Sequence, residues 1–118
     1  MNARLEPICE QVREIISRAI AFEMRDPAFE GVTITRVRVS PDYQFADVRY
    51  TTYDDEDREL AEAGFQRARG ALRSAVAKQI NMRKTPQLRF HYDEDVVAER
   101  RISDILEGLK EDSPNVEA

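Results

Sequence analysis

The sequence predicts a single α+β domain in which helices cover one face of a three-stranded sheet. Apolar residues recur every three or four positions in residues 5–24 and 60–82, which is the spacing of amphipathic helices. Three shorter segments alternate apolar and polar residues, as half-buried strands do. The 118 residues are 42% hydrophobic and 35% charged, which suits one small domain with much solvated helix surface. The expected order is helix, strand, strand, helix, kink, helix and strand, with a short final helix.

The first helix is expected over residues 5–24. Its apolar stripe is formed by Leu5, Ile8, Val12, Ile15, Ile16, Ala19 and Ile20. Pro7 is tolerated only in the first turn of a helix, so the helix should begin near Glu6. Asp26 precedes Pro27, and the residue before a proline is pushed out of the α region, which ends the helix.

Two strands, residues 32–39 and 44–53, are expected to form an antiparallel hairpin. A Ser-Pro-Asp turn at residues 40–42 separates them. The alternation of inward-facing apolar residues in the first strand shifts by one position after Ile34. A β-bulge near residues 35–36 would accommodate this shift. In the second strand, one face should carry Ala46, Val48, Tyr50 and Thr52.

An acidic run precedes the second helix and consists of Asp54, Asp55, Glu56 and Asp57. Acidic side chains cap helix N-termini and interact favourably with the positive end of the helix dipole. A divalent-metal site is the alternative, but consecutive acids on a loop rarely converge on one ion. We therefore expect a helix cap and no metal.

The second helix is expected to be interrupted at Gly70. Glycine within a helix costs about 1 kcal/mol relative to alanine, so it marks a bend or a close approach. Before this glycine, the buried band is formed by Leu60, Ala61, Gly64, Phe65 and Ala68. Beyond it, the core face is formed by Leu72, Ala75, Val76, Gln79 and Met82.

Residues 64–92 hold seven basic side chains and no Asp or Glu, although the whole chain has a formal net charge of -5. On the outer face of the helix, Gly70 and Ser74 are flanked by Arg73 and Lys78, and small residues between cations would let a phosphate backbone approach closely. The alternative is an ordinary solvated helix surface, but no acid interleaves to form the usual i,i+4 pairs. The segment therefore indicates an anion-binding face, with nucleic acid as the first candidate. Its basic residues are Arg67, Arg69, Arg73, Lys78, Arg83, Lys84 and Arg89.

The last strand, residues 87–93, alternates Leu88 and Phe90 with Arg89 and His91. His91 is the only histidine, and we interpret it as a surface residue because nothing nearby suggests a nucleophile. The chain also lacks a Gly-rich phosphate loop, a Cys/His pair and a nucleophile elbow. We therefore expect no enzyme, no cofactor and no small-molecule substrate.

The C-terminal segment, residues 93–110, is expected to form one or two helical turns. These turns would use Val96, Val97, Ile102, Ile105, Leu106 and Leu109. Residues 1–110 would then be the domain, and residues 111–118 a flexible tail. The apolar runs are too short to span a membrane, no secretory signal is visible, and Cys9 has no partner for an internal disulfide, so a cytoplasmic protein is expected.

Four short motifs follow one another along the chain. They are Asp26-Pro27 with Val32-Thr33, Ser40-x-Asp42 with Ala46-x-Val48, Ala68-Arg69-Gly70, and Arg83-x-x-Pro86-x-Leu88-x-Phe90-x-x-Asp93. With these motifs, residues 4–106 resemble the bacterial ribosome-binding factor A family.

The resemblance implies a type II KH-like fold, in which a kinked Ala-x-Gly turn replaces the usual GXXG loop. It also implies a monomeric, cytoplasmic assembly factor of the small (30S) ribosomal subunit. Such a factor binds free immature subunits and 16S rRNA, supports rRNA processing at the 5′ end, leaves before translation, and is linked to growth in the cold.

The expected RNA-binding residues are Arg69, Gly70, Arg73, Ser74, Lys78, Arg83, Lys84 and Arg89. The cations would contact phosphates, and the small residues would permit close approach. Two alternatives remain open at this point. One is a protein–protein adaptor whose basic face docks an acidic partner, and the other is a generic KH-type RNA-binding module unrelated to ribosomes.

Overall fold

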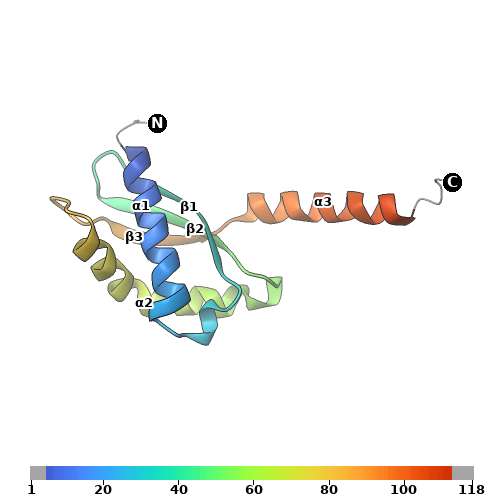
Figure 1. The fold of residues 1–118 in the computed structure, drawn as a ribbon, viewed down its shortest axis with the longest axis horizontal. Coiled ribbons are helices and arrows are strands. Elements are labelled where there is room, and N and C mark those ends of the chain that lie inside the picture. The colour runs from blue at the N-terminus through green and yellow to red at the C-terminus, as the bar shows by residue number, and fades with distance from the viewer. Residues whose placement is uncertain (1–4, 113–118) are drawn as a thin grey trace.

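The computed structural model describes residues 5–112 and confirms the predicted α+β class (Figure 1). Two helices pack on one face of a three-stranded sheet, and a third extends away from it (Figure 1). The elements are α1 (Leu5–Arg18), β1 (Thr33–Val39), β2 (Phe45–Thr51), α2 (Arg58–Gln79), β3 (Gln87–Tyr92) and α3 (Glu94–Asp112). None of the helices in this part of the chain is long and apolar enough to cross a membrane.

The first helix is α-helical only as far as Arg18 and continues as a π-helical turn, Ala19–Glu23. The N–H of Met24 donates to the carbonyl of Ala19 at 2.9 Å, which closes this wider turn. The predicted apolar stripe is confirmed, since all of its residues except the half-buried Ile8 are buried.

The predicted hairpin and its β-bulge are also confirmed. The antiparallel register pairs Ile34 with Tyr50 and then Arg36 with Arg49, so Thr35 is the extra residue in β1. Beyond the bulge, the valines of β1 turn toward the core and its arginines turn toward solvent.

The third strand lies beside β2 and runs parallel to it, from the pair Phe45 and Gln87 to the pair Tyr50 and Tyr92. A parallel neighbour requires a crossover connection, and α2 provides it. The order in the sheet is therefore β1-β2-β3. The sequence predicted the strand but not its neighbour or its direction.

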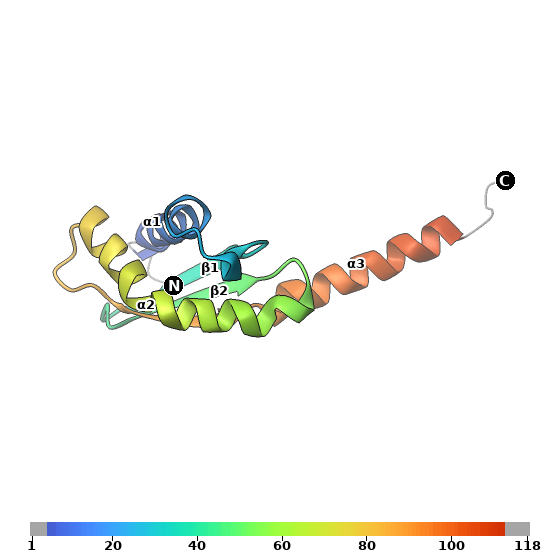
Figure 2. The ribbon, with the colours of Figure 1, turned by 90° about the horizontal axis from the view of Figure 1, so that it is seen from below.

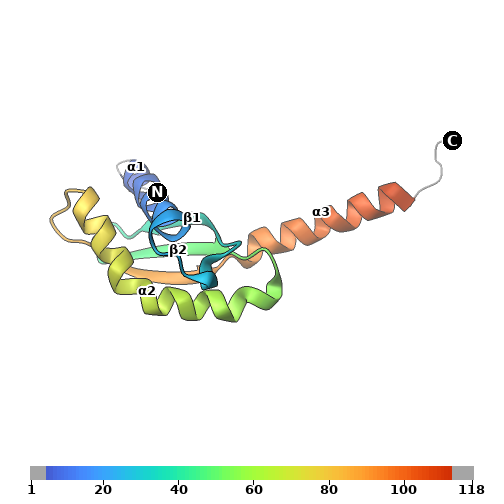
Figure 3. The same ribbon diagram turned by 60° about the horizontal axis from the view of Figure 1, so that its bottom comes forward.

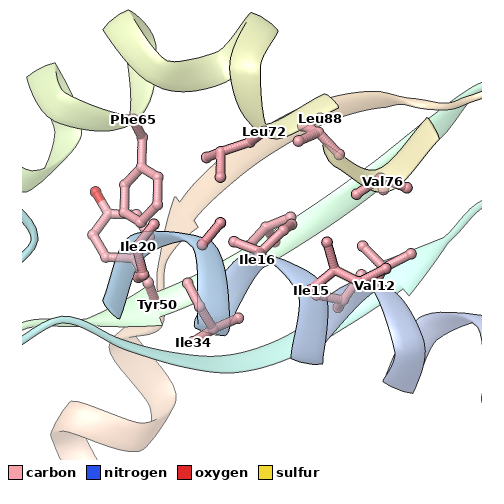
Figure 4. Packing of buried hydrophobic residues seen from close by; sticks show 14 of the residues in the cluster. Val12, Ile15, Ile16, Ile20, Ile34, Tyr50, Phe65, Leu72, Val76 and Leu88 are labelled. Atoms are coloured by element: carbon pink, nitrogen blue, oxygen red, sulfur yellow. The ribbon is translucent and has the colours of Figure 1, made fainter. Parts of the chain in front are cut away.

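The core lies between α1, α2 and the inner face of the sheet (Figure 4). Its centre is Phe65 of α2, whose ring stacks on Phe90 with centroids 4.5 Å apart and lies 4.6 Å from Tyr50 and 4.9 Å from Phe29. Full burial of a phenylalanine side chain contributes about 1.5–3 kcal/mol. Other large and fully buried side chains are Ile16, Leu72, Leu88, Val12, Val48 and Val76.

Two helical segments joined by a kink at Gly70 were expected. The structure instead has one helix, α2, which continues through Gly70 and bends part-way along its length (Figures 1 and 2). It ends at Gln79 and does not reach Met82. Leu60 was expected in the buried band but is 53% exposed, because it lies about 120° around the helix from Leu72. Gln79 was expected on the core face but is exposed in the last turn.

The final helix, α3, has 19 residues, so the expectation of one or two helical turns is wrong. It extends away from the sheet and makes the molecule 63 Å long, against 34 and 20 Å in the other directions (Figures 2 and 3). Val97 is buried at its start, but four later apolar side chains are at least 60% exposed: Ile102, Ile105, Leu106 and Leu109. Of the expected tail, residues 113–118 lie outside the described residues, and residues 111–112 belong to α3.

Asp93 joins α3 to the sheet. One carboxylate oxygen accepts from the N–H of Val96 at 3.1 Å, and the other accepts from the hydroxyl of Thr35 at 2.6 Å. The residue is only 5% exposed. Burial alone would raise the pKa of Asp93, but the hydrogen bonds from Thr35 and Val96 hold its pKa below the ordinary value. The carboxylate therefore stays charged at neutral pH and ties the bulge of β1 to the first turn of α3.

Gly64 should resist substitution, because a Cβ there would lie 2.7 Å from the Cβ of Ala28 and 3.2 Å from a ring carbon of Phe29. We expect Gly64→Ala to lower the free energy of unfolding by about 1–3 kcal/mol, the cost of overpacking a core. Gly70→Ala is the matched control, because a Cβ added at Gly70 would meet nothing within 4 Å and alanine favours a helix by about 0.5–1 kcal/mol. Urea denaturation of both variants measures the difference, and equal effects would contradict this packing.

Asp93→Ala should lower the free energy of unfolding by about 1–3 kcal/mol at pH 7, because it removes a helix cap and leaves Thr35 without its acceptor. Since the pKa of Asp93 is depressed on folding, its contribution is present above the unfolded value of about 4 and is lost as the pH falls through the folded value. The wild-type protein should therefore lose more stability than Asp93→Asn between about pH 5 and pH 3. Denaturation at several pH values measures this slope, and parallel curves for the two proteins would exclude the role of Asp93.

Candidate nucleic-acid interface

The outer face of α2 and the loop that follows it form a cationic surface, which we call the helix surface. Because the apolar side of α2 packs on the sheet, its polar side is exposed to solvent. The surface carries seven of the eight predicted RNA-binding residues, all of them exposed: Arg69, Gly70, Arg73, Ser74, Lys78, Arg83 and Lys84.

The loop is held to α2 by Arg73. Its guanidinium donates to the carbonyl of Thr85 at 2.8 Å. Pro86 is fully buried beside it and fixes the start of β3. Arg73 therefore has a structural role as well as a charge, and this contact holds the loop that carries Arg83 and Lys84 against the helix.

The other cations of the helix surface have few intramolecular partners. Lys78, Arg83 and Lys84 form no ion pair or side-chain hydrogen bond with any residue between positions 5 and 109. Arg69 donates only to Gln66, one turn earlier in the same helix. An anion that reaches this surface would not have to displace a protein carboxylate from these four side chains.

A hollow of about 710 Å³ lies at the end of the helix surface, between this loop and the turn of the hairpin. Its lining combines the cations Arg83 and Lys84 with Tyr43 and the carboxylate of Asp42. Hydrogen bonds from the Ser40 hydroxyl and a backbone N–H hold the pKa of Asp42 below its ordinary value, and nearby Lys84 lowers it further. The charged carboxylate borders the cations on this side, so a polyanion would approach from the α2 side.

Arg89 is the one predicted RNA-binding residue that lies apart. It is on the outer face of the sheet, where it donates two hydrogen bonds to Asp47, at 2.8 and 3.1 Å. Its guanidinium also lies 4.1 Å from the ring centroid of Phe45. Arg89 therefore lies apart from the helix surface, because alternation along β3 directs Leu88 inward and Arg89 away from the helices. Its predicted contact with RNA stays a prediction.

The acidic run does not cap α2 in the expected way. Residues 55–57 form a 3-10 turn before the helix, and neither Asp54 nor Asp57 accepts a side-chain capping hydrogen bond. Instead, Asp55 pairs with Arg101 of α3 and accepts from the hydroxyl of Tyr92 at 3.3 Å. Among the described residues, no group of three or more His, Cys, Asp or Glu side chains is placed to hold a metal ion.

A family model described as ribosome-binding factor A matches residues 4–106. The chain is 37% identical over 115 residues to the ribosome-binding factor A of a Marinomonas species, covering 93% of this chain and 89% of that protein. The chain belongs to the ribosome-binding factor A family.

Solved structures of ribosome-binding factor A share the fold. The crystal structure of the protein from Thermus thermophilus has a TM-score of 0.65 and 26% identity, and the match covers 73% of this chain and 92% of that one. A homology model of the Thermus thermophilus protein, fitted into a cryo-EM map of its 30S complex, has a TM-score of 0.62 and 28% identity, with 77% of this chain and 93% of that chain covered. These similarities are consistent with the KH-like fold that the family resemblance implied.

The double variant Lys78→Glu/Lys84→Glu should weaken binding to duplex RNA at least tenfold and leave the melting temperature nearly unchanged, because both side chains are exposed and lack intramolecular partners in the described chain. The wild-type protein should show a slope of about -3 to -5 in log K against log salt, for about four to six phosphate contacts. The variant's slope should be shallower by about two. Fluorescence anisotropy over a salt series measures these quantities.

Arg18→Glu/Arg100→Glu is the control for this experiment, since it changes the net charge equally at exposed positions outside the helix surface. It should bind RNA nearly as well as the wild-type protein. An equal loss of affinity in both double variants would show that net charge, and not the helix surface, controls binding.

Proposed function

We propose that this protein is an assembly factor that binds free, immature small ribosomal subunits through contacts to 16S rRNA. The observation that carries the proposal is the family match over residues 4–106, which spans both packed helices and the whole sheet. The fitted 30S complex of the Thermus thermophilus protein supports the small subunit as the partner.

The helix surface supports contacts to the phosphate backbone. Lys78, Arg83 and Lys84 offer exposed cationic groups, and Arg69 extends the same surface along α2. Gly70 has open space around its Cα, so a backbone can approach the helix closely there. The hydroxyl of Ser74 adds an exposed hydrogen-bonding group one turn later.

The surface favours recognition of RNA shape over base sequence. Phe65, Tyr50 and Phe90 are packed in the core, so these rings cannot stack on bases. A row of cations on a rigid helix matches the phosphates of a folded RNA, which present the same chemistry whatever the sequence. This suits a factor that must distinguish an immature fold of the RNA from a mature one.

The proposal extends to the consequences of binding. By holding an immature arrangement of the rRNA, the protein would support processing at the 5′ end and would leave before translation begins. Mispaired RNA helices live longer as the temperature falls, which gives a physical reason for a requirement during growth in the cold. Binding as a monomer in the cytoplasm is part of the same proposal.

The test is sedimentation of the tagged full chain through a sucrose gradient of cell lysate. The protein should migrate with free small subunits and be absent from complete ribosomes and polysomes. Lys78→Glu/Lys84→Glu should shift it to the top of the gradient, and Arg18→Glu/Arg100→Glu should not. Wild-type protein found only at the top would contradict the proposal and would favour an adaptor that docks an acidic protein.

A further inference from the structure

A second group of cations occupies the outer face of the sheet, on the side away from α1 and α2. The strand register places Arg36, Arg49 and His91 in one row across the three strands. The next row holds Arg38, Asp47 and Arg89. Partners in register share one face of a sheet, so these six side chains form one array, which we call the sheet surface.

The charge of the sheet surface is poorly balanced. Asp47 is its central carboxylate, and it is bound by Arg89 at 2.8 Å and by Nε2 of His91 at 2.9 Å. Asp95 reaches Arg49 only at 4.0 Å and is itself 91% exposed. Glu94 borders the same depression but is paired with Arg58 at 2.8 Å. Four guanidinium groups of the strands thus face two engaged carboxylates and one solvated carboxylate.

Arg36 and Arg38 have no ion-pair or side-chain hydrogen-bond partner among residues 5–109. Arg36 also stands directly opposite Arg49, an arrangement that destabilises a sheet. A rule of local stability that is broken without a compensating contact commonly marks a functional surface. An external anion would supply the missing compensation.

The shape of the surface favours an extended polyanion over a small molecule. The depression above the strands has a volume of about 590 Å³. Its lining combines three arginines of β1 and β2, His91 and Tyr92 with the carboxylates of Asp47, Glu94 and Asp95. Guanidinium groups bind phosphate in a bidentate manner, and neighbouring strands repeat such groups at intervals of about 5 Å. Phe45 at the rim is covered by Arg89, so a ring on which bases could stack is not offered there.

We propose that the sheet surface binds the phosphate backbone of a second RNA segment, so that one protein molecule bridges two RNA helices. The inference rests on the proposed function and deepens it. The helix surface lies on the side of the sheet that the helices cover, and the sheet surface lies on the other side. An RNA helix on one surface therefore leaves the other surface accessible.

The test uses the full chain with two RNA duplexes of about 16 base pairs, one labelled with a donor and one with an acceptor fluorophore. Wild-type protein should produce energy transfer between the duplexes, with a maximum near one protein per two duplexes and a decline when protein is in excess. Arg36→Glu/Arg38→Gln should reduce this transfer at least tenfold while the protein still binds a single duplex.

The variant should fold, because the carboxylate introduced at position 36 faces Arg49 and replaces a repulsion with an attraction. Its melting temperature should equal or exceed that of the wild-type protein. Lys78→Glu/Lys84→Glu is the matched variant of the other surface, and it should also lose energy transfer. The duplex binding that remains in this variant, at least tenfold weaker than in the wild-type protein, should come from the sheet surface.

Three outcomes would overturn the inference. The wild-type protein could bind one duplex without energy transfer, Arg36→Glu/Arg38→Gln could retain full transfer, or polyglutamate could displace a duplex as well as unlabelled RNA does. The last outcome would favour an acidic protein as the partner. A failure of the proposed function can be distinguished from a failure of this inference. It would appear in the sucrose gradient as loss of binding to the small subunit, whether or not the protein bridges two duplexes.

Discussion

The arrangement of the molecule depends on the single extra residue in β1. Without the bulge, strict alternation from Ile34 would direct Arg36 and Arg38 into the core, where an unpaired guanidinium costs several kcal/mol. With Thr35 inserted, the valines that follow complete the inner face of the sheet and the two arginines reach solvent. The hydroxyl of Thr35 then binds Asp93, which caps α3. One register shift therefore determines the core face of β1, the charge of the outer face and the anchor of the last helix.

The packing of α2 separates the two cationic surfaces. Phe65, Leu72 and Val76 direct one side of the helix toward the sheet, which leaves the polar side exposed along its whole length. The crossover that α2 makes between β2 and β3 is also what places Arg89 beside Asp47. The crossover through α2 thus positions the helix surface on one side of the sheet. By bringing Arg89 of β3 beside Asp47, it also completes the sheet surface on the other side.

Sequence patterns predicted what depends on periodicity, and they failed where the outcome depends on distant partners. The bulge could be predicted because the shift in apolar alternation between Ile34 and Val37 lies within the sequence of one strand. The sheet surface could not, because its rows join residues from three strands and depend on the parallel pairing of β3. A signal was nevertheless present, since every arginine of the strands falls on the phase opposite to the buried apolar residues. The length of α3 could not be predicted from packing, because four of its apolar side chains remain at least 60% exposed.

The distribution of charge along the long axis gives the protein a preferred direction of approach to RNA. The acidic residues 54–57 and the start of α3, with Glu94 and Asp95, lie at one end of the sheet. The loop that carries Arg83 and Lys84 lies at the other end (Figure 1). With a net charge of -5, the molecule as a whole is repelled by phosphates, so only a segregated arrangement lets its cations reach them. Repulsion at the acidic end and attraction at the two cationic surfaces would orient the domain before contact, which adds specificity without base-reading side chains.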